Sequence, residues 1–566
     1  MSKILGINCS GFHSSACLIV DGEIQYAICE ERLSRVKQDK AFPLRAIKYC
    51  CDAANIRFSE ITDAFVGWHP RFYISQSDNT LDDALQNRGK LSYLTLNELA
   101  TLSNTPIEDV SQSLLTGNSN LKIHFVDHHK AHAANVFFHS GCNKADFLIL
   151  DGFGEITCGI SGVMDGDKIE VFRSYPTPHS LGLFYAAFTD FLGFKRHRDE
   201  WKVMALSSLG NPEKYYPFIR SLITVKGLEY EVDLRYFEYY LFFTPRFFSR
   251  KLCDVLGDPL LKGAEPSQRD CDIVAAVQRV VEETVFEMLN TLHSKTGNKN
   301  LALGGGFFMN SVLNGKVHEC TPYKNVFLGG SPDDSGISIG SALYGLNYVL
   351  NEKTYPMHLR HNYFGRTYSD EEVLVELKRR KIRFSEVDHL PSTVARLVRS
   401  KKIVAVFQGR SEFGQRALGN RSILADPTHA DIKDIVNATI KCRESFRPFA
   451  PSILKERQSD VFEVDDNQTS YFMERVFRYR TGWKGKAPAV VHFDGTGRLQ
   501  TVDKEVNPLF YEVIQEFEKL SGVPLVLNTS LNINGMPLVE TPGDALDCFY
   551  QSGLDALVLH NYLVEK

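Results

Sequence analysis

Two histidines four residues apart are the sharpest chemical signal in this sequence. His128 and His132 lie in the run Asp127-His128-His129-Lys130-Ala131-His132. On a helix, this spacing puts both imidazoles on one face, which is the geometry that a shared metal ion needs. A pair of polar helix residues near an interface between lobes would show the same spacing, so neighbouring chemistry must decide between the two interpretations.

Two acidic turns could complete such a metal site. Asp151 follows the apolar run 147–150, and Asp333-Asp334 precedes a predicted helix over 337–350. Two histidines with one or two carboxylates form a mixed nitrogen and oxygen set that suits Fe(II), Mn(II) or Zn(II). The alternatives are a turn-forming role for Asp151 and a helix N-cap at Asp333 or Asp334.

Arginine and glycine mix in three segments of the second half of the chain, at 409–422, 441–448 and 494–498. Guanidinium groups match phosphate and carboxylate oxygens bidentately, and a neighbouring lysine adds a point charge. Together the segments predict an anion pocket, although basic runs also occur on solvated surfaces. The segment 528–532, after a predicted strand, adds amide and hydroxyl groups that could orient a small polar substrate.

The elements that must position these residues begin with two similar hairpins. Strands are predicted at 3–8, 16–20 and 24–29, and the same order of apolar runs and turns returns at 146–162. Two such hairpins suggest a duplicated fold. The pattern resembles the actin-like ATPases, in which each of two lobes opens with a hairpin whose turn faces the nucleotide phosphates.

A glycine run supports the same interpretation. Residues 301–303 form a short apolar strand that leads into Gly304, Gly305 and Gly306 and then a predicted helix over 307–317. Glycine permits close approach of the backbone, and a helix N-terminus favours anions, so Gly305 and Gly306 are candidate nucleotide-binding residues. A structural turn between strand and helix remains the alternative. Neither the P-loop motif nor the Rossmann glycine motif is present in the sequence.

The length of 566 residues predicts three to four units or two large lobes with insertions. A polar stretch near residue 355 predicts a domain boundary, which gives domains 1–355 and 356–566. After it, strands at 403–407, 522–527 and 556–559 alternate with helices at 370–381 and 392–400, as in an α/β domain. The aromatic segment within 211–270 contains no motif that predicts a function.

Composition excludes several classes of protein. Charged residues make up 23% and apolar residues 43% of the chain, as in a soluble globular protein. Lys and Arg number 64 against 69 Asp and Glu, a net charge of −5, so no nucleic-acid partner is expected. The sequence contains neither a long apolar run nor a cleavable signal, so we expect no membrane partner and a cytoplasmic protein. The 12 cysteines form no Cys-x-x-Cys pair, which argues against zinc fingers and a disulfide framework.

Together these segments resemble the O-carbamoyltransferases of the nodulation, cephamycin and tobramycin type, over nearly the whole chain. Phe12-His13-Ser14 replaces the usual Gly-His-Asp of that family, and Gln415 stands where Pro is frequent. The matching motifs, in chain order, are Gly11 to Ala16, Glu30 to Lys37, His128 to His132, Leu150 to Glu155, Ser180 to Tyr185, Trp201 to Met204, Gly304 to Gly306, Asp333 to Gly336, Phe413 to Gly419, Lys441 to Pro448, and Leu527 to Ser530.

The resemblance implies an actin-like, two-lobe N-terminal domain similar to the tRNA threonylcarbamoyl-transferring ATPase, followed by a YrdC-like C-terminal domain. In that family, carbamoyl phosphate and ATP give carbamoyl-adenylate in the YrdC-like domain. The carbamoyl group then passes to a hydroxyl of a small-molecule acceptor at the metal site. The implied cofactors are ATP, Mg²⁺, and iron or else Mn²⁺ or Zn²⁺. Biosynthesis of an antibiotic or another secondary metabolite is the implied setting, and a homodimer is compatible with it.

The resemblance also implies residue roles. The metal ligands would be His128, His132, Asp151 and Asp334, with Asp334 preferred to Asp333 because it precedes the Ser-Gly pair. His13 would be the general base beside the acceptor, and Lys37 would help to hold the adenylate or its acceptor. The residues that would hold carbamoyl phosphate and the nucleotide are Arg416, Lys441, Arg447, Arg498, Asn528 and Ser530.

Three rival functions share part of this pattern. A tRNA threonylcarbamoylating enzyme shares the fold, but the charge balance disfavours it. A carbamoyltransferase of hydrogenase maturation would carry Cys-x-x-Cys zinc fingers, which this sequence does not have. A non-catalytic, actin-like nucleotide-binding protein would leave the arginine and lysine segments without a role.

Overall fold

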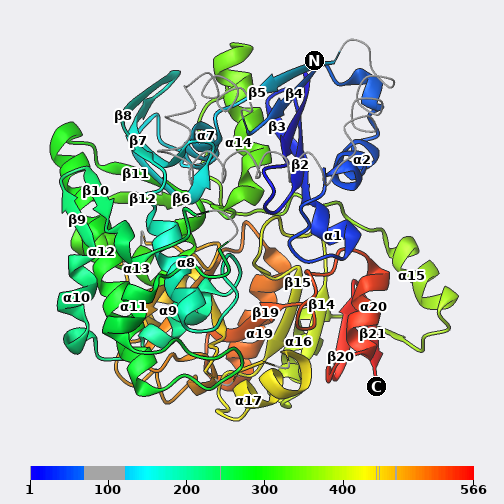
Figure 1. The fold of residues 1–566 in the computed structure, drawn as a ribbon. Helices are drawn as coiled ribbons and strands as arrows, with labels where there is room; N and C mark the ends of the chain where they lie inside the picture. The colour runs from blue at the N-terminus through cyan, green and yellow to red at the C-terminus, as the bar shows by residue number, and fades with distance from the viewer. Residues whose placement is uncertain (1, 69–120, 242–243, 442, 445, 466–467) are drawn as a thin grey trace. The chain divides into compact units, whose positions relative to one another are not determined.

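A computed structural model describes residues 2–68, 121–241, 244–441, 443–444, 446–465 and 468–566 (Figure 1). The chain divides into two compact units. The first comprises residues 1–30 and 39–359, and the second comprises residues 31–38 and 360–566. The division after Leu359 lies close to the boundary predicted at 355, whereas the assignment of residues 31–38 to the second unit was not predicted.

The first unit contains two five-stranded sheets with the same topology. One has the order β3-β2-β1-β4-β5 and the other the order β8-β7-β6-β11-β12. In each, the first three strands along the chain are antiparallel, the fourth pairs in parallel with the first, and the fifth pairs in parallel with the fourth. This repeat confirms the predicted duplication and the actin-like, two-lobe class of fold. The strands are β1 Lys3–Asn8, β2 Ser15–Val20, β3 Glu23–Cys29, β4 Asp63–Val66, β5 Lys122–Phe125, β6 Lys144–Gly154, β7 Thr157–Asp165, β8 Lys168–Pro176, β11 Asn300–Gly304 and β12 Asn325–Leu328.

Two helices of the first unit, α7 (His128–Phe138) and α14 (Ile337–Tyr344), pack against each other (Figure 1). The close contact depends on Gly340, where an added Cβ would lie 1.9 Å from the carbonyl oxygen of Ala131. The other helices of this unit include α2 Leu44–Ala53, α8 Leu181–Phe191, α9 Glu200–Ser207, α10 Tyr216–Ser221, α11 Arg250–Leu256, α12 Gln268–Thr296 and α13 Ser311–Cys320, and a small hairpin pairs β9 Ile223–Lys226 with β10 Glu229–Val232.

The second unit is built on a nine-stranded mixed sheet with one large apolar core. It is the α/β domain expected after residue 355. Its strand order is β13-β21-β20-β14-β15-β19-β16-β18-β17, and the strands are β13 Ser385–Glu386, β14 Val404–Phe407, β15 Arg421–Ala425, β16 Ala450–Leu454, β17 Arg475–Arg478, β18 Thr496–Val502, β19 Leu525–Ser530, β20 Ala556–Leu559 and β21 Tyr562–Glu565. Its helices include α15 Asp370–Arg379, α16 Leu390–Arg399, α17 Ile432–Val436, α18 Gln458–Val461, α19 Pro508–Ser521 and α20 Pro542–Tyr550, and all but the first residue of α1 Glu30–Ser34 belongs to the same unit.

Two predicted elements differ from the structure. The strand expected over 522–527 begins only at Leu525 and runs on to Ser530, because Gly522 is the left-handed C-cap of α19. The helix expected over 307–317 begins only at Ser311, after a single 3₁₀ turn at Gly306–Met309. The side chain of Asn310 accepts a hydrogen bond from the backbone N–H of Leu313 and caps the helix there. Among the described residues, no helix combines the length and apolar character needed to cross a bilayer.

Candidate metal and anion sites

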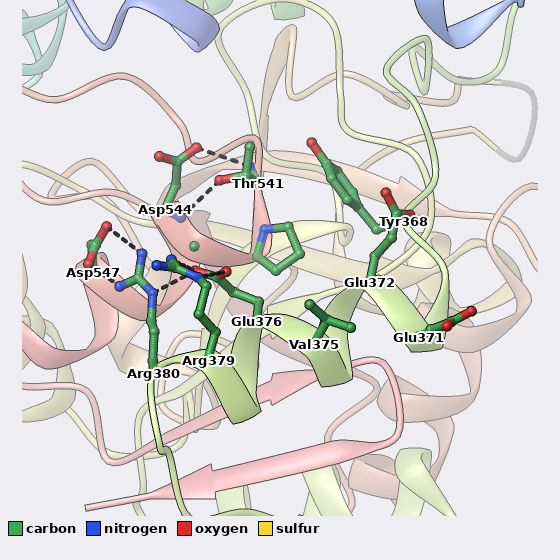
Figure 2. Close-up of a pocket in the computed structure, with 12 residues that line it drawn as sticks. Tyr368, Glu371, Glu372, Val375, Glu376, Arg379, Arg380, Thr541, Asp544 and Asp547 are labelled. Atoms are coloured by element: carbon green, nitrogen blue, oxygen red, sulfur yellow. Dashed lines mark hydrogen bonds and ion pairs between the residues drawn. The ribbon is translucent and has the colours of Figure 1, made fainter.

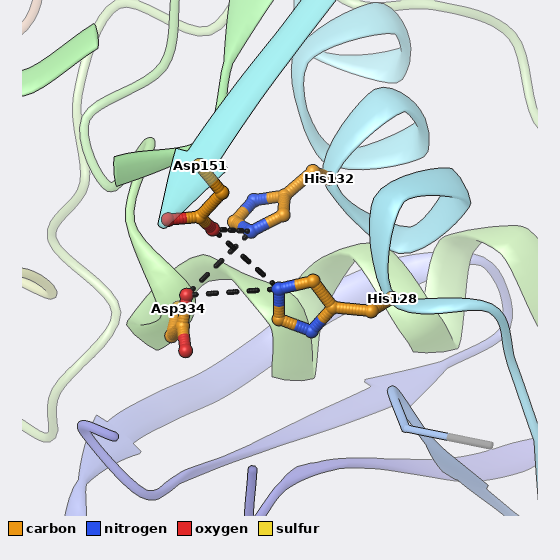
Figure 3. Close-up of side chains that lie close together, drawn as sticks. All are labelled: His128, His132, Asp151 and Asp334. Atoms are coloured by element: carbon orange, nitrogen blue, oxygen red, sulfur yellow. Dashed lines mark hydrogen bonds and ion pairs between the residues drawn. The ribbon is translucent and has the colours of Figure 1, made fainter. Parts of the chain in front are cut away.

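Four predicted ligands meet in the first unit. One ligand atom from each of His128, His132, Asp151 and Asp334 lies within 4.8 Å of all the others (Figure 3). Both histidines stand on α7, and both present Nε2 to Oδ2 of Asp151, at 3.5 Å for His128 and 3.0 Å for His132. Oδ1 of Asp334 lies 3.8 and 3.7 Å from the same two nitrogens. The four side chains therefore converge on one point.

Local structure explains why each ligand points inward. Asp127 caps α7 by accepting a hydrogen bond from the N–H of Lys130, so the helix begins at His128 and aligns His132 one turn later. Asp151 lies in β6, at an irregularity in its pairing with β7. Asp334 lies in a 3₁₀ turn, and Ser10 Oγ donates a 3.0 Å hydrogen bond to its Oδ2. The N-cap alternative for this turn is not what the structure shows, because neither aspartate side chain caps a helix.

Glycines pack directly against these ligands. A Cβ on Gly154 would lie 2.2 Å from Cδ2 of His128, and a Cβ on Gly306 would lie 2.9 Å from Oδ1 of Asp151. Gly305 has φ +92°, and a Cβ there would lie 2.1 Å from the carbonyl oxygen of Leu150. The predicted nucleotide residues Gly305 and Gly306 thus lie beside the predicted metal ligand Asp151, where a Cβ would clash with its neighbours.

The charges of the cluster suit a divalent cation. Burial opposes ionisation of Asp151, but hydrogen bonds from His128 and His132 outweigh it and hold the Asp151 pKa well below its usual range. Burial raises the pKa of Asp334, and the nearby charge of Asp151 raises it further. Nδ1 of both histidines has no hydrogen-bond partner among the described residues. Two imidazoles and two carboxylates fit the mixed donor set of Fe(II), Mn(II) or Zn(II).

His13 lies beside this cluster, on the turn between β1 and β2. Its Nδ1 lies 2.7 Å from Oδ2 of Asp333, and Ser335 Oγ donates a 2.6 Å hydrogen bond to the other carboxylate oxygen. Because Asp333 and Asp334 are consecutive, one turn carries both the partner of His13 and a predicted metal ligand. The sequence offered Asp333 only as a metal-site carboxylate or a helix N-cap, and its pairing with His13 was not predicted.

Cationic side chains gather in the second unit. Around Arg498, the charges of Arg416, Arg443 and Arg447 are close enough to add to the effect of burial, and its pKa falls well below the usual range. Burial and the charges of Arg443, Lys37 and Arg447 similarly lower the pKa of Lys441. The structure therefore brings together the predicted residues Lys37, Arg416, Lys441, Arg447 and Arg498, which with Arg443 we call the cation cluster.

Arg443 lies in the basic segment 441–448 but is not among the predicted site residues. Its guanidinium lies 4.5 Å from the ring centroid of Phe449, and its Nε donates a 2.7 Å hydrogen bond to Oδ1 of Asn437. Burial, with Arg447 beside it, lowers the pKa of Arg443 to about 9. Cys442 and Ser445, in the same predicted segment, lie outside the described residues.

Lys441 is fully engaged with the backbone and side chains of one loop. Its Nζ lies 2.5 Å from the carbonyl oxygen of Ser530, 2.9 Å from that of Asn532 and 2.8 Å from Oδ1 of Asn532. An ammonium group has three donors, and these three oxygens use them all. Lys441 therefore anchors the loop after β19 and contributes its charge to the cluster.

Asn528 has an amide orientation that is fixed by its neighbours. Gln500 Nε2 donates to the Leu418 carbonyl at 2.9 Å, so Gln500 Oε1 faces Asn528 Nδ2, which donates to it at 2.8 Å. Nδ2 also donates to Ser452 Oγ at 3.0 Å, and Oδ1 of Asn528 has no partner among the described residues. This oxygen is a buried acceptor beside the turn that carries Arg416, and Ser530 stands two residues further along the same strand.

A groove of 640 Å³ in the second unit lies against α15 and α20 (Figure 2). Arg380, at the end of α15, pairs with Glu376 of the same helix at 2.6 Å and crosses to Asp547 of α20 at 2.5 Å. The groove contains none of the predicted site residues. The residues that line it are Tyr368, Glu371, Glu372, Val375, Glu376, Arg379, Arg380, Thr541, Pro542, Gly543, Asp544 and Asp547.

Comparison with known proteins defines the class of this chain. The family model described as Carbamoyltransferase N-terminus matches residues 3–343, and Carbamoyltransferase C-terminus matches residues 395–566. The chain therefore belongs to the carbamoyltransferase family, as the sequence motifs predicted, and it is a transferase by that membership.

Individual relatives match over nearly the full length. Nodulation protein NolNO of Sinorhizobium fredii is 35% identical over 573 residues, which cover 98% of this chain and 78% of that protein. An uncharacterized protein of Synechocystis sp. is 33% identical, with 100% of this chain and 97% of that protein covered. Among solved structures, component A of the (R)-2-hydroxyglutaryl-CoA dehydratase of Acidaminococcus fermentans gives a TM-score of 0.35 at 13% identity, over 61% of this chain and 97% of that one. A likeness at this level carries no functional argument.

Proposed function

We propose that this protein is a cytoplasmic, ATP-dependent O-carbamoyltransferase with two active sites. In the second unit, carbamoyl phosphate, ATP and water would yield carbamoyl-adenylate, orthophosphate and pyrophosphate. In the first unit, the carbamoyl group would pass to a hydroxyl of a small-molecule acceptor, with release of AMP. Membership of the carbamoyltransferase family supports the transfer, while the adenylate and the class of acceptor belong to the proposal.

The observation that carries the proposal is the separation of two opposite kinds of chemistry. Residues that suit a divalent cation and a general base belong to the first unit, and the cation cluster belongs to the second. Phosphoryl and pyrophosphate groups need several positive charges, whereas attack by an alcohol needs a base and a polarised carbonyl. The two steps of the proposed reaction divide between the units in the same way.

In the second unit, the arginines would hold phosphate oxygens through paired N–H donors. Arg498, Arg443 and Arg447 carry charges that repel one another in the free protein, so binding of a polyanion relieves that repulsion. Asn528 Oδ1, an acceptor without a partner among the described residues, suits the NH₂ group of a carbamoyl donor. Lys441 would hold the loop that contains Ser530 in place.

In the first unit, His13 would remove the proton of the acceptor hydroxyl. Its Nδ1 contact with Asp333 fixes the orientation of the ring and stabilises the imidazolium that forms, so Nε2 is the nitrogen assigned to take the proton. The residues that would hold the metal are His128, His132, Asp151 and Asp334. A divalent ion held there would supply a Lewis acid for the carbamoyl carbonyl oxygen. Ser10 and Gly306 keep the two carboxylates in place.

The first step can be tested without any acceptor. Purified protein would be incubated with carbamoyl phosphate, ATP and Mg²⁺, and carbamoyl-adenylate and pyrophosphate would be followed by mass spectrometry. We expect both products from the wild type and from His128→Ala, but neither from Arg447→Ala. If the wild type forms only ADP, or binds ATP without forming either product, the proposed first step is wrong and a kinase or nucleotide-switch function takes its place.

A further inference from the structure

Residues 31–38, which we call the 31–38 loop, comprise most of the short helix α1 (Glu30–Ser34) and the turn that follows it, and they belong to the second unit, more than 300 residues before the rest of that unit begins. The loop closes on itself, because the backbone N–H of Gln38 donates a 2.7 Å hydrogen bond to Oε2 of Glu31. The N–H of Arg35 donates at 3.0 Å to the Glu31 carbonyl. It is therefore a defined piece of structure with its own internal contacts.

Arg32 ties this loop to the turn that carries Arg416. The side chain is 3% exposed, and its NH2 group donates a hydrogen bond to the carbonyl oxygen of Gly414. Gly414 has φ +92°, a conformation that glycine adopts readily, and it stands two residues before Arg416. The contact fixes the start of the turn from which a predicted phosphate-binding arginine projects.

Arg35 ties the same loop to the segment that follows β19. Its guanidinium donates to the carbonyl oxygens of Leu538 at 2.7 Å and Pro537 at 3.1 Å, and it lies 3.7 Å from Asp544. The other end of this segment is held by Lys441, through Ser530 and Asn532. The backbone N–H of Val539 donates at 3.1 Å to the carbonyl oxygen of Leu531, so the two anchored ends belong to one closed turn.

Lys37 lies two residues after Arg35, and its positive charge is close enough to Lys441 to help lower the pKa of that lysine. A loop from the first tenth of the chain therefore contacts two loops of the cation cluster and adds a member to it.

We propose that residues 31–38 are a functional part of the donor pocket, and that Arg32 and Arg35 are positioning residues that hold the 414–416 turn and the 530–538 loop in register around the bound phosphates. This inference rests on the proposed function, because it assumes that the cation cluster binds a phosphate-containing donor. Neither arginine is assigned contact with the substrate. Each acts through backbone carbonyls of the loops that carry the binding groups.

Arg35 allows a sharp test because its backbone has φ +62°. Glycine adopts that conformation without strain, so Arg35→Gly removes the guanidinium and leaves the backbone favoured. Lys381→Gly is the matched control, since Lys381 is an exposed cation of the same unit with φ +55°. Arg35→Lys keeps the charge but loses the fork that reaches two carbonyls.

The measurement is pyrophosphate release from ATP and carbamoyl phosphate without acceptor. We expect Arg35→Gly to raise KM for carbamoyl phosphate roughly 10- to 100-fold, as displacement of a binding group would, with Arg35→Lys intermediate and Lys381→Gly unchanged. Guanidinium chloride, added far below denaturing concentrations, should restore part of the loss in Arg35→Gly alone.

Two results would overturn the inference. One is a wild-type KM in Arg35→Gly. The other is a loss that guanidinium does not restore and that accompanies a lowered melting temperature, which would mean a purely structural role. Titration with inorganic pyrophosphate by calorimetry separates this inference from the proposed function. If the wild type releases no pyrophosphate from ATP, the proposed function fails. In that case, weaker binding of added pyrophosphate by Arg35→Gly than by the wild type would still support the positioning role. Equal binding by the two proteins would contradict it.

Discussion

His128, His132, Asp151 and Asp334, which we call the metal cluster, suit a cation, whereas the cation cluster suits an anion, and the two are built differently. In the first unit, two carboxylates and two imidazoles converge within 4.8 Å. Two further histidines of this unit are kept neutral, because burial lowers the pKa of His197 to about 4 and that of His129 well below its usual range. In the second unit, cations gather, and burial together with their mutual repulsion lowers the pKa values of Arg498 and Lys441. One region concentrates negative charge at a point, and the other spreads positive charge over several loops.

The difference shows how much each site depends on distant parts of the chain. The predicted metal ligands come from one helix, one strand and one turn, and they are held by the cap at Asp127, by close packing of Gly306 against Asp151, and by one hydrogen bond from Ser10 to Asp334. The cation cluster draws on at least three loops that are held by carbonyl contacts from Lys441, Arg32 and Arg35. We therefore expect the metal cluster to be most sensitive to changes in the ligands themselves. The cation cluster should also be sensitive to changes in the residues that hold its loops.

The largest effect is expected when the metal cluster loses one carboxylate charge. Asp151→Asn keeps the shape of the side chain but removes the charge that faces both histidines, so affinity for added Fe²⁺ or Mn²⁺ should fall more than about 100-fold, beyond the loss typical of partners that only orient a ligand. Isothermal titration of metal-depleted protein would measure it. Asp127→Asn, at the cap of the same helix, is the control and should bind metal normally; equal affinity in both variants would contradict the assignment.

A smaller loss of function, with an unchanged or higher free energy of unfolding, is expected from a substitution in the second unit. Arg498→Met removes a buried charge from among like charges, so the free energy of unfolding should stay equal or rise. Pyrophosphate release should fall on the order of 100-fold, as when one donor of a preorganised anion site is lost. Denaturant melts and the acceptor-free assay would measure both, with exposed Arg478→Met on the neighbouring strand as control. A large loss of stability in Arg498→Met would mean that this arginine is a structural residue.

The smallest effect concerns the neutral histidine near the metal cluster. The ring centroids of His197 and Phe12 lie 5.6 Å apart, and Phe12 directly precedes His13 in the chain. Burial lowers the pKa of His197 to about 4. Between pH 6.5 and 4 the unfolded chain binds a proton at this residue that the folded chain does not, so stability should fall as the pH falls through this window. His197→Asn, which tolerates the residue's φ of +60°, should remove up to about 3 kcal/mol of that fall. Urea unfolding at pH 7 and pH 4.5 would show it, whereas exposed His358→Asn should follow the wild type.

Periodic and local features were predictable from the sequence. The spacing of His128 and His132 required only a helix between them, and the repeated hairpins required only turn residues, so both predictions are confirmed. The start of α13 was misplaced, because Asn310 provides a cap that the glycine run obscured. Contacts between distant segments could not be predicted. The pairing of His13 with Asp333 and the contacts of Arg35 with Pro537 and Leu538 depend on tertiary structure that no local pattern encodes.

The loop at residues 31–38 has a consequence for how this protein can be divided and inherited. A gene cut at residue 360 would encode the second unit without eight of its residues, and a fragment that ends at residue 359 would carry those eight residues as an orphan. Division of the gene into two halves is therefore disfavoured, because the second product would lack residues 31–38 and the first product would carry them without the unit to which they belong. Recombination that preserves the second unit must keep residues 31–38 in the same gene as residues 360–566.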